Sequence, residues 1–226
     1  MTTPEAAIPL WERAELRAAA GTTLRPGGLN LTDRAAELIG VVPGWRVLDV
    51  GSGLGATMKR LCSRYGAQAF GVETSLQQIQ RASTGSRCVQ ADGAILPFGD
   101  GVFHALFCEC VLSLFDDKSA GLREFYRVLR PGGFLVLSDL HGEGGEGVGS
   151  GASCADRAGP LSVTREMLVA QGFSVFLVED HSRHLKELAA KLIFIDGKPR
   201  NQCTCESRRV GYHLVIAQKK GLENGG

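Results

Sequence analysis

The stretch from Arg46 to Gly55, RVLDVGSGLG, constrains the fold of this chain more than any other. Its apolar first half favours a buried strand, and its closely spaced glycines allow a tight turn that other residues would strain. Residues 56–65 then favour a helix. A strand that passes through a glycine turn into a helix is the nucleotide-binding corner of open α/β sheets. In such sheets, ligands lie outside the carboxyl ends of the strands.

Strands and helices alternate along the rest of the chain. Apolar runs predict strands at 69–73, 88–92, 102–111, 134–137, 173–179 and 210–218. Amphipathic spacing predicts helices at 76–82, 118–129, 164–171 and 187–195, the last beginning near Ser182. This alternation is typical of a parallel sheet covered on both faces. The last two strands need not be joined to the sheet by strand–helix–strand units. We expect one domain over residues 1–226.

Two segments lie outside this alternation. Residues 1–44 predict short helices interrupted by a turn at 25–28, with Asn30 or Thr32 capping the second helix. We expect this segment to pack on the sheet, and the alternative is that it folds over the ligand site. Residues 142–153 are rich in glycine and predict a flexible loop, which is either a lid or a plain connection.

The composition favours a soluble protein without a polyanionic partner. The net charge is +1, and no basic run or tail suggests nucleic acid or an anionic membrane as a partner. No apolar run reaches the ~20 residues that a membrane span needs, and the first residues do not resemble a signal peptide. We therefore expect a cytoplasmic protein with a small-molecule substrate and seven reduced cysteines. Nothing in the sequence specifies an oligomeric state.

Three carboxylates end three predicted strands, and each suits a different part of one ligand. Asp49 at the glycine corner disfavours a pyrophosphate and suits a cation such as an α-ammonium group. Glu73 can accept hydrogen bonds from both hydroxyls of a ribose. Asp92 can accept one from the adenine amino group, with Ile95 and Leu96 beside the ring. An amino acid, a ribose and an adenine together make S-adenosylmethionine (SAM).

The glycines alone do not identify this cofactor. Residues 51–56, GSGLGA, also satisfy the G-x-G-x-x-A pattern of dinucleotide-binding proteins. The positions of Asp49 and Asp92 favour SAM over NAD. An NAD-dependent oxidoreductase therefore stays as the less favoured alternative, beside a protein that binds SAM without transferring its methyl group.

Three motifs together resemble the class I SAM-dependent methyltransferases. They are residues 47–55 (VLDVGSGLG), 91–98 (ADGAILPF) and 122–133 (LREFYRVLRPGG). The chain is most similar to the methyltransferase type 11 branch, which includes ubiquinone/menaquinone-biosynthesis and arsenite methyltransferases. The resemblance implies a Rossmann-like, mostly parallel sheet of seven strands with helices on both faces and an antiparallel last strand. It also implies methyl transfer from SAM, with S-adenosylhomocysteine (SAH) as product.

The same resemblance implies which residues hold the cofactor. Residues 49–55 correspond to the part that holds the methionine, Glu73 to the ribose contact, and residues 92–94 to the adenine contact. The cofactor-binding residues that we expect are Asp49, Gly51, Ser52, Gly53, Gly55, Glu73, Thr74, Asp92, Gly93, Ala94 and Cys108. His104 stands where the family usually has an aspartate, a position to which we attach little functional weight.

No residue can be named as catalytic from the sequence. The SAM sulfonium already activates the methyl group, so the protein mainly aligns the acceptor with it. Ser113 and Asp139 are candidates for the acceptor side at the ends of the fourth and fifth strands. Glu109 and His141 are further candidates there and could act as a general base where the acceptor arrives protonated.

The cysteines suggest a rival site. Cys108 and Cys110 are two apart on a predicted strand, so both should face one side, and Cys203 and Cys205 repeat the spacing. Thiolates bind soft metals and arsenic-like centres. The spacing is narrower than that of zinc sites, and free cysteine is a common buried apolar residue. We therefore expect Cys108 and Cys110 to pack in the core, and no metal site.

Overall fold

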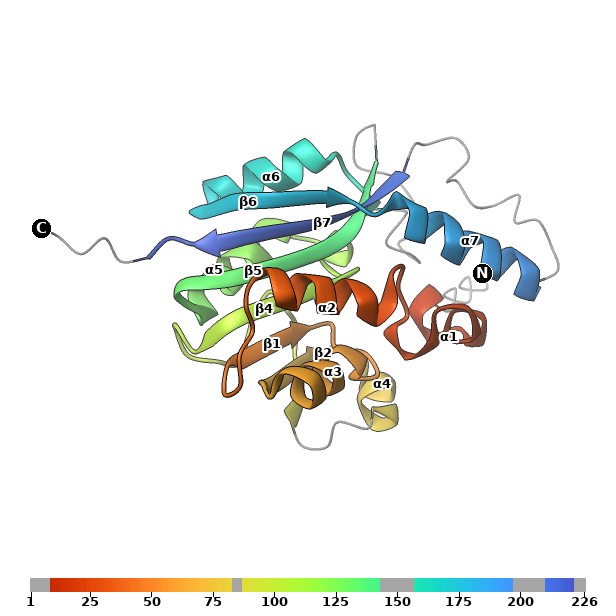
Figure 1. Ribbon diagram of the computed structural model, residues 1–226, viewed down its shortest axis with the longest axis horizontal. Helices are drawn as coiled ribbons and strands as arrows, with labels where there is room; N and C mark the ends of the chain where they lie inside the picture. The colour runs from red at the N-terminus through yellow and green to blue at the C-terminus, as the bar shows by residue number, and fades with distance from the viewer. Residues whose placement is uncertain (1–8, 83–86, 143–156, 197–209, 222–226) are drawn as a thin grey trace, which may run out of the picture.

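The structure is a computed structural model that describes residues 9–82, 87–142, 157–196 and 210–221 (Figure 1). Its centre is a seven-stranded sheet of order β3-β2-β1-β4-β5-β7-β6. The strands are β1 (Arg46–Val50), β2 (Gln68–Glu73), β3 (Cys88–Gln90), β4 (Phe103–Glu109), β5 (Leu129–Gly142), β6 (Phe173–Asp180) and β7 (Val210–Lys219). Strands β1 to β5 pair in parallel, and β7 pairs antiparallel with both β5 and β6. The predicted fold class is therefore confirmed.

Helices cover both faces of this sheet. The α-helices are α1 (Ala14–Ala20), α2 (Gly28–Leu38), α3 (Ala56–Tyr65), α4 (Leu76–Arg81), α5 (Lys118–Val128), α6 (Leu161–Ala170) and α7 (Ser182–Asp196). Short 3₁₀-helices are η1 (Leu10–Glu12), η2 (Gly21–Thr23) and η4 (Leu112–Leu114). Figure 1 shows α1 at the right of the view, close to α7, which it contacts. Within the described residues, no helix combines the length and hydrophobicity of a membrane span.

Alternation along the strands separates two hydrophobic cores. Val47 of β1 belongs to the core that contains Leu61 of α3, together with buried residues of α2. Its neighbour Leu48 belongs to the core that contains Phe125 of α5, together with Leu168 of α6. Successive strand residues point to opposite faces, so a sheet covered on both sides must bury both sets. This packing fixes the sheet and leaves the carboxyl ends of its parallel strands at one edge.

Several element boundaries differ from the sequence-based expectation, and two of them change how the chain packs. Helix α2 begins at Gly28 after an N-cap at Gly27, and no side chain caps it. Thr32 therefore lies inside the helix instead of capping it, and its hydroxyl is turned toward Arg25. Strand β5 begins at Leu129, directly after α5, because Leu129 already pairs with Phe103 of β4. The proline–glycine sequence at 131–133 interrupts this strand, because the pairing with β4 shifts register between Leu129 and Phe134 and Gly132 has left-handed backbone with φ 74°.

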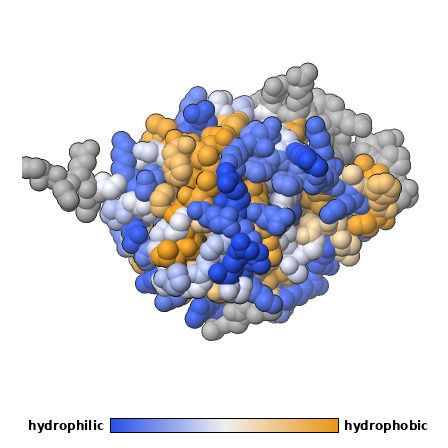
Figure 2. Space-filling model, in the orientation of Figure 1, coloured by the Kyte–Doolittle hydropathy of each residue, from blue (hydrophilic) through white to orange (hydrophobic). Residues whose placement is uncertain are grey.

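The exposed surface mixes hydrophilic and hydrophobic residues in the view of Figure 2. A hydrophobic patch at the right edge lies over the C-terminal end of α7, where Ile193, Phe194 and Ile195 are exposed. None of these three side chains lines the cavity described below. They are therefore not part of the candidate ligand site.

Candidate functional site

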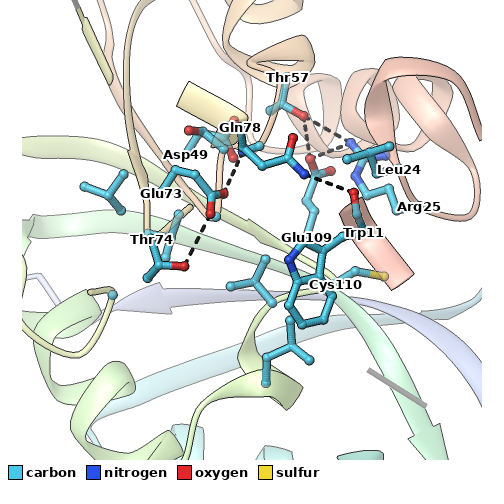
Figure 3. A pocket seen from close by; sticks show the side chains of 18 of the residues that line it. Trp11, Leu24, Arg25, Asp49, Thr57, Glu73, Thr74, Gln78, Glu109 and Cys110 are labelled. Carbon is cyan, nitrogen blue, oxygen red and sulfur yellow. Dashed lines mark hydrogen bonds and ion pairs between the residues drawn. The ribbon is translucent and has the colours of Figure 1, made fainter. Parts of the chain in front are cut away.

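A cavity of about 600 Å³ lies at the carboxyl ends of the first four strands (Figure 3). Residues 49–54 line it after β1, 72–74 at the end of β2, 91–94 after β3 and 109–111 after β4. Its volume falls in the usual range for small-molecule sites. The cavity therefore lies where open α/β sheets bind their ligands.

The glycine corner adopts the backbone that its sequence predicts. Gly51, Gly53 and Gly55 have φ angles of 70°, 52° and 76°, in the left-handed region. A Cβ at Gly51 would lie 2.3 Å from Cγ2 of Val111, so a side chain has no room there. Gly51, Ser52 and Gly53 line the cavity, whereas Gly55 is the N-cap of α3 and does not. The corner thus brings bare backbone and a helix N-terminus to the ligand space.

Asp49 presents an unsatisfied carboxylate to this cavity. Its side chain is 3% exposed, and Oδ2 has no hydrogen-bond partner among the described residues. Burial raises the pKa of Asp49 well above its usual range; Glu109 adds to the shift and the Arg25 guanidinium opposes it. A buried acceptor without a partner costs about 1–3 kcal/mol. A bound ammonium group would satisfy it, which fits the predicted role of Asp49.

Glu73 is held in place by backbone donors. One carboxylate oxygen accepts from the Gly53 N–H and the other from the Ser75 N–H, each at 2.9 Å. The Thr74 hydroxyl also donates, at 3.4 Å, to the oxygen that Ser75 contacts, so the oxygen that accepts from Gly53 keeps a lone pair for a ribose hydroxyl. Thr74 follows Glu73 along the same wall of the cavity.

Asp92 lies at the far end of the same wall. Its Oδ1 accepts from the Ala94 N–H at 2.8 Å, and residues 92–94 all line the cavity. Ile95 and Leu96 do not, because Ile95 is 76% exposed and Leu96 is buried in the core. The expectation that these two side chains flank an adenine is therefore wrong. Ala91 and Phe115 supply the apolar surface beside Asp92.

The two described cysteines of the predicted thiol site are separated. Cys108 is fully buried in the core under α5 and does not line the cavity, which corrects its expected place in the cofactor site. Cys110 lines the cavity and packs against the opposite core. The two do not share a face because β4 ends at Glu109 and Cys110 turns into left-handed backbone with φ 60°.

Two further features that the sequence singled out, the second cysteine pair and the glycine-rich loop, lie outside the described residues. Cys203 and Cys205 fall outside the described residues, and so does the glycine-rich segment 142–153 apart from Gly142. The described part of the chain contains no cluster of three or more His, Cys, Asp or Glu side chains that could hold a metal ion.

The N-terminal segment forms a wall of the cavity. From the sequence, packing on the sheet was the favoured expectation for this segment, and a position over the ligand site was the alternative. Trp11 and residues 22–25 line the cavity. Two contacts to α4 and its N-cap hold the segment there. The Gln78 side chain donates to the Trp11 carbonyl at 3.0 Å, and the Ser75 hydroxyl donates to the Glu12 carboxylate at 3.1 Å. No local sequence pattern indicates these contacts, since they join residues more than 60 positions apart.

A buried ion pair joins this segment to the end of β4. The Arg25 guanidinium lies 2.5 Å from Oε2 of Glu109, and the two side chains are 3% and 4% exposed. Thr57 donates to the same oxygen at 2.7 Å, and Thr32 donates to Oε1 at 3.3 Å. Arg25 also donates to the Gly28 carbonyl at 2.6 Å. Glu109 is therefore a structural counter-ion, and the geometry does not support it as a general base.

The other acceptor-side candidates lie outside the main cavity. Ser113, Asp139 and His141 line a separate pocket of about 20 Å³, close to the size of one water. The N–H and hydroxyl of Ser113 both donate to Asp139 at 2.8 Å, which fixes η4 to β5. His104 is likewise structural, because its Nδ1 accepts from the Arg46 N–H at 3.1 Å.

His141 gives the protein a predictable response to acid. Burial, and secondly the neighbouring His213, lower the pKa of His141 to about 4, below the ~6.5 of an unfolded chain. The neutral form is thus favoured on folding, so its stabilisation is present above pH ~6.5 and is lost as the pH falls toward 4. Between pH 7 and pH 4, we expect the free energy of unfolding of the wild type to fall by about 3 kcal/mol relative to that of His141→Leu. Urea unfolding of both proteins measures this, and a pH-independent difference would contradict it.

Comparisons with known proteins agree with this geometry. Residues 48–137 match a family model described as a methyltransferase domain. Phosphoethanolamine N-methyltransferase 1 of Zea mays is 27% identical over 84% of this chain and 40% of its own length. The chain thus spans less than half the length of that relative.

Two solved structures share the fold. The [4+2]-cyclase SpnF is 25% identical with a TM-score of 0.72, over 85% of this chain and 80% of that one. Phosphoethanolamine N-methyltransferase 2 of Haemonchus contortus, in complex with SAM, is 20% identical with a TM-score of 0.74, over 91% and 56%. The domain match contains the glycine corner, Glu73 and Asp92. Residues 48–137 therefore match a methyltransferase domain, and the chain is similar to SAM-dependent methyltransferases in sequence and in fold.

Proposed function

We propose that this protein binds SAM in the main cavity and transfers its methyl group to a small-molecule acceptor. The observation that carries the proposal is the buried Asp49 carboxylate, which lies beside the glycine corner with one oxygen unpaired. A pyrophosphate would be repelled at this point, whereas the ammonium group of an amino acid would supply the missing hydrogen bond. This charge preference favours SAM over a dinucleotide.

The chain's own residues would bind and orient the two substrates. Asp49 would hold the ammonium group, Glu73 the ribose hydroxyls, and residues 92–94 the adenine. SAM supplies a methyl group that its sulfonium already activates. Trp11 and Leu24 of the N-terminal wall would exclude water from the space around that group. The main contribution of the protein is then alignment, and the proposal needs no general base.

Two further statements belong to this proposal. Relatives and neighbours named as methyltransferases of phosphoethanolamine, quinone precursors and geranyl diphosphate support a small-molecule acceptor. A cytoplasmic location is supported by Cys62, Cys88 and Cys108, whose thiols form no disulfide.

A second candidate is a protein that binds SAM without transferring its methyl group. The SpnF neighbour supports it, because a [4+2]-cyclase shares this fold. Incubation with methyl-labelled SAM and fractionated small-molecule extracts separates the two. We expect label to appear in an extract component and SAH to form in equal amount. SAH binding without label transfer from any fraction would contradict methyl transfer and favour a protein that uses the fold for another purpose.

A further inference from the structure

Two unusual backbone positions lie in the wall of the main cavity. Leu24 and Cys110 are the non-glycine residues with positive φ in the described part of the chain, at 56° and 60°. Both line the cavity. Left-handed backbone is uncommon for residues with a side chain, and it persists where the surroundings enforce it, often at functional sites.

The buried ion pair links these two positions. Leu24 directly precedes Arg25, and Cys110 directly follows Glu109, so the Arg25–Glu109 contact at 2.5 Å joins the two corners. Arg25 and Glu109 thereby act as positioning residues for the side chains beside them. The Cys110 thiol is further held beside the buried Tyr212 hydroxyl at 3.7 Å.

Leu24 and Val111 lie against the glycine corner, because a Cβ at Gly53 would be 3.9 Å from Cδ1 of Leu24 and one at Gly51 would be 2.3 Å from Cγ2 of Val111. Figure 3 shows Glu73 and Thr74 on the left of the view and Leu24 with Arg25 on the right. The surface near Leu24 and Cys110 is completed by the apolar side chains of Trp11 and Val111. Beside the Arg25–Glu109 ion pair, this part of the cavity therefore offers apolar side chains to a ligand.

The charged side chains that line the cavity also limit which acceptors can bind there. Six carboxylates and two guanidiniums line it among the described residues. Arg25 is committed to Glu109, and Arg157 donates to the Leu114 carbonyl at 3.0 Å and to Asp116 at 2.6 Å. Both cations are thus already neutralised. Ala56 and Thr57 at the N-terminus of α3 also line the cavity, and the Thr57 hydroxyl is committed to Glu109 at 2.7 Å.

We propose that the acceptor is an uncharged, largely apolar molecule without a phosphate group, and that it binds against Leu24 and Cys110. This inference rests on the proposed methyl transfer. A phosphate monoester carries a charge of about −1.5 to −2 at neutral pH and would need an uncommitted cation in this wall. The acceptor would accordingly differ in class from the phosphorylated base named for the maize relative.

The test uses a matched pair of probes, 1-naphthol and 1-naphthyl phosphate, titrated into the SAH-loaded protein. We expect 1-naphthol to bind at least tenfold more tightly than its phosphate ester. Equal or tighter binding of the ester overturns the proposal, and so does the absence of binding by either probe. SAH binding is measured first, because its absence would refute the proposed function itself.

A charge placed in the wall sharpens this test. Leu24→Lys should raise the affinity for 1-naphthyl phosphate at least fivefold and lower that for 1-naphthol. Val169→Lys adds the same charge at a 62% exposed position of α6 and should change neither affinity by more than twofold. Cys110→Gly relieves the positive φ and serves where Leu24→Lys does not fold. Cys110→Gly should lower the affinity for 1-naphthol at least threefold and leave the affinity for SAH unchanged. An unchanged affinity for 1-naphthol would count against the proposal.

Discussion

Replacement of Glu109 by leucine is expected to lower the free energy of unfolding by about 3–5 kcal/mol. The substitution leaves the Arg25 guanidinium buried without its counter-ion, since both side chains are less than 5% exposed. It also removes the acceptor of the Thr57 hydroxyl. Urea unfolding at pH 7 measures the change.

The controls for this prediction come from the same chain. Arg25→Met combined with Glu109→Leu should recover most of the loss, because an apolar pair carries no desolvation penalty. Glu187→Ala breaks the Arg183–Glu187 pair, whose side chains are 90% and 50% exposed, and should cost no more than about 1 kcal/mol. A loss below 1 kcal/mol for Glu109→Leu would show that the buried pair does not fix the N-terminal wall.

Asp49→Asn is expected to move stability and cofactor affinity in opposite directions. Burial disfavours the carboxylate and raises the pKa of Asp49, so removal of its charge should increase the free energy of unfolding. The same change removes the charge-assisted hydrogen bond to the ammonium group of SAH. That loss should cost about 1.5–3 kcal/mol of binding, or roughly 10- to 150-fold in Kd.

Calorimetric titration and thermal unfolding of the same samples measure both effects. Asp116→Asn is the matched control, because Asp116 also lines the cavity but is 94% exposed. It should alter SAH affinity and stability only slightly. A decrease in both quantities for Asp49→Asn would mean that Asp49 supports the fold and is not a binding group.

The sequence predicted the sheet and the glycine corner because both are encoded locally. The apolar run before Gly51 sets β1, the left-handed glycines set the turn, and residues 56–65 form α3 with the predicted bounds. Asp49 and Glu73 reach the same cavity since the carboxyl ends of parallel strands meet at one edge. Periodicity and turn chemistry suffice for such features.

The cavity wall around the Arg25–Glu109 pair could not be predicted because it depends on contacts between distant segments. Arg25 and Glu109 are 84 positions apart, and the sequence indicates only a turn around Arg25. Cys110 was expected to share a face with Cys108, but its left-handed backbone depends on how the chain leaves β4. Ile95 was assigned to the adenine wall on hydrophobicity alone and proves to be exposed. Such outcomes follow from tertiary packing, which overrides local preference.

The central claim is that the cavity beside Asp49 and Glu73 accepts SAM and not a dinucleotide. The most direct measurement is calorimetric titration of SAH and, separately, of NAD into the unaltered protein. The account predicts saturable binding of one SAH per chain and no binding of NAD at the same concentrations. Saturable NAD binding without SAH binding would contradict it and would support the oxidoreductase alternative that the glycine pattern permits.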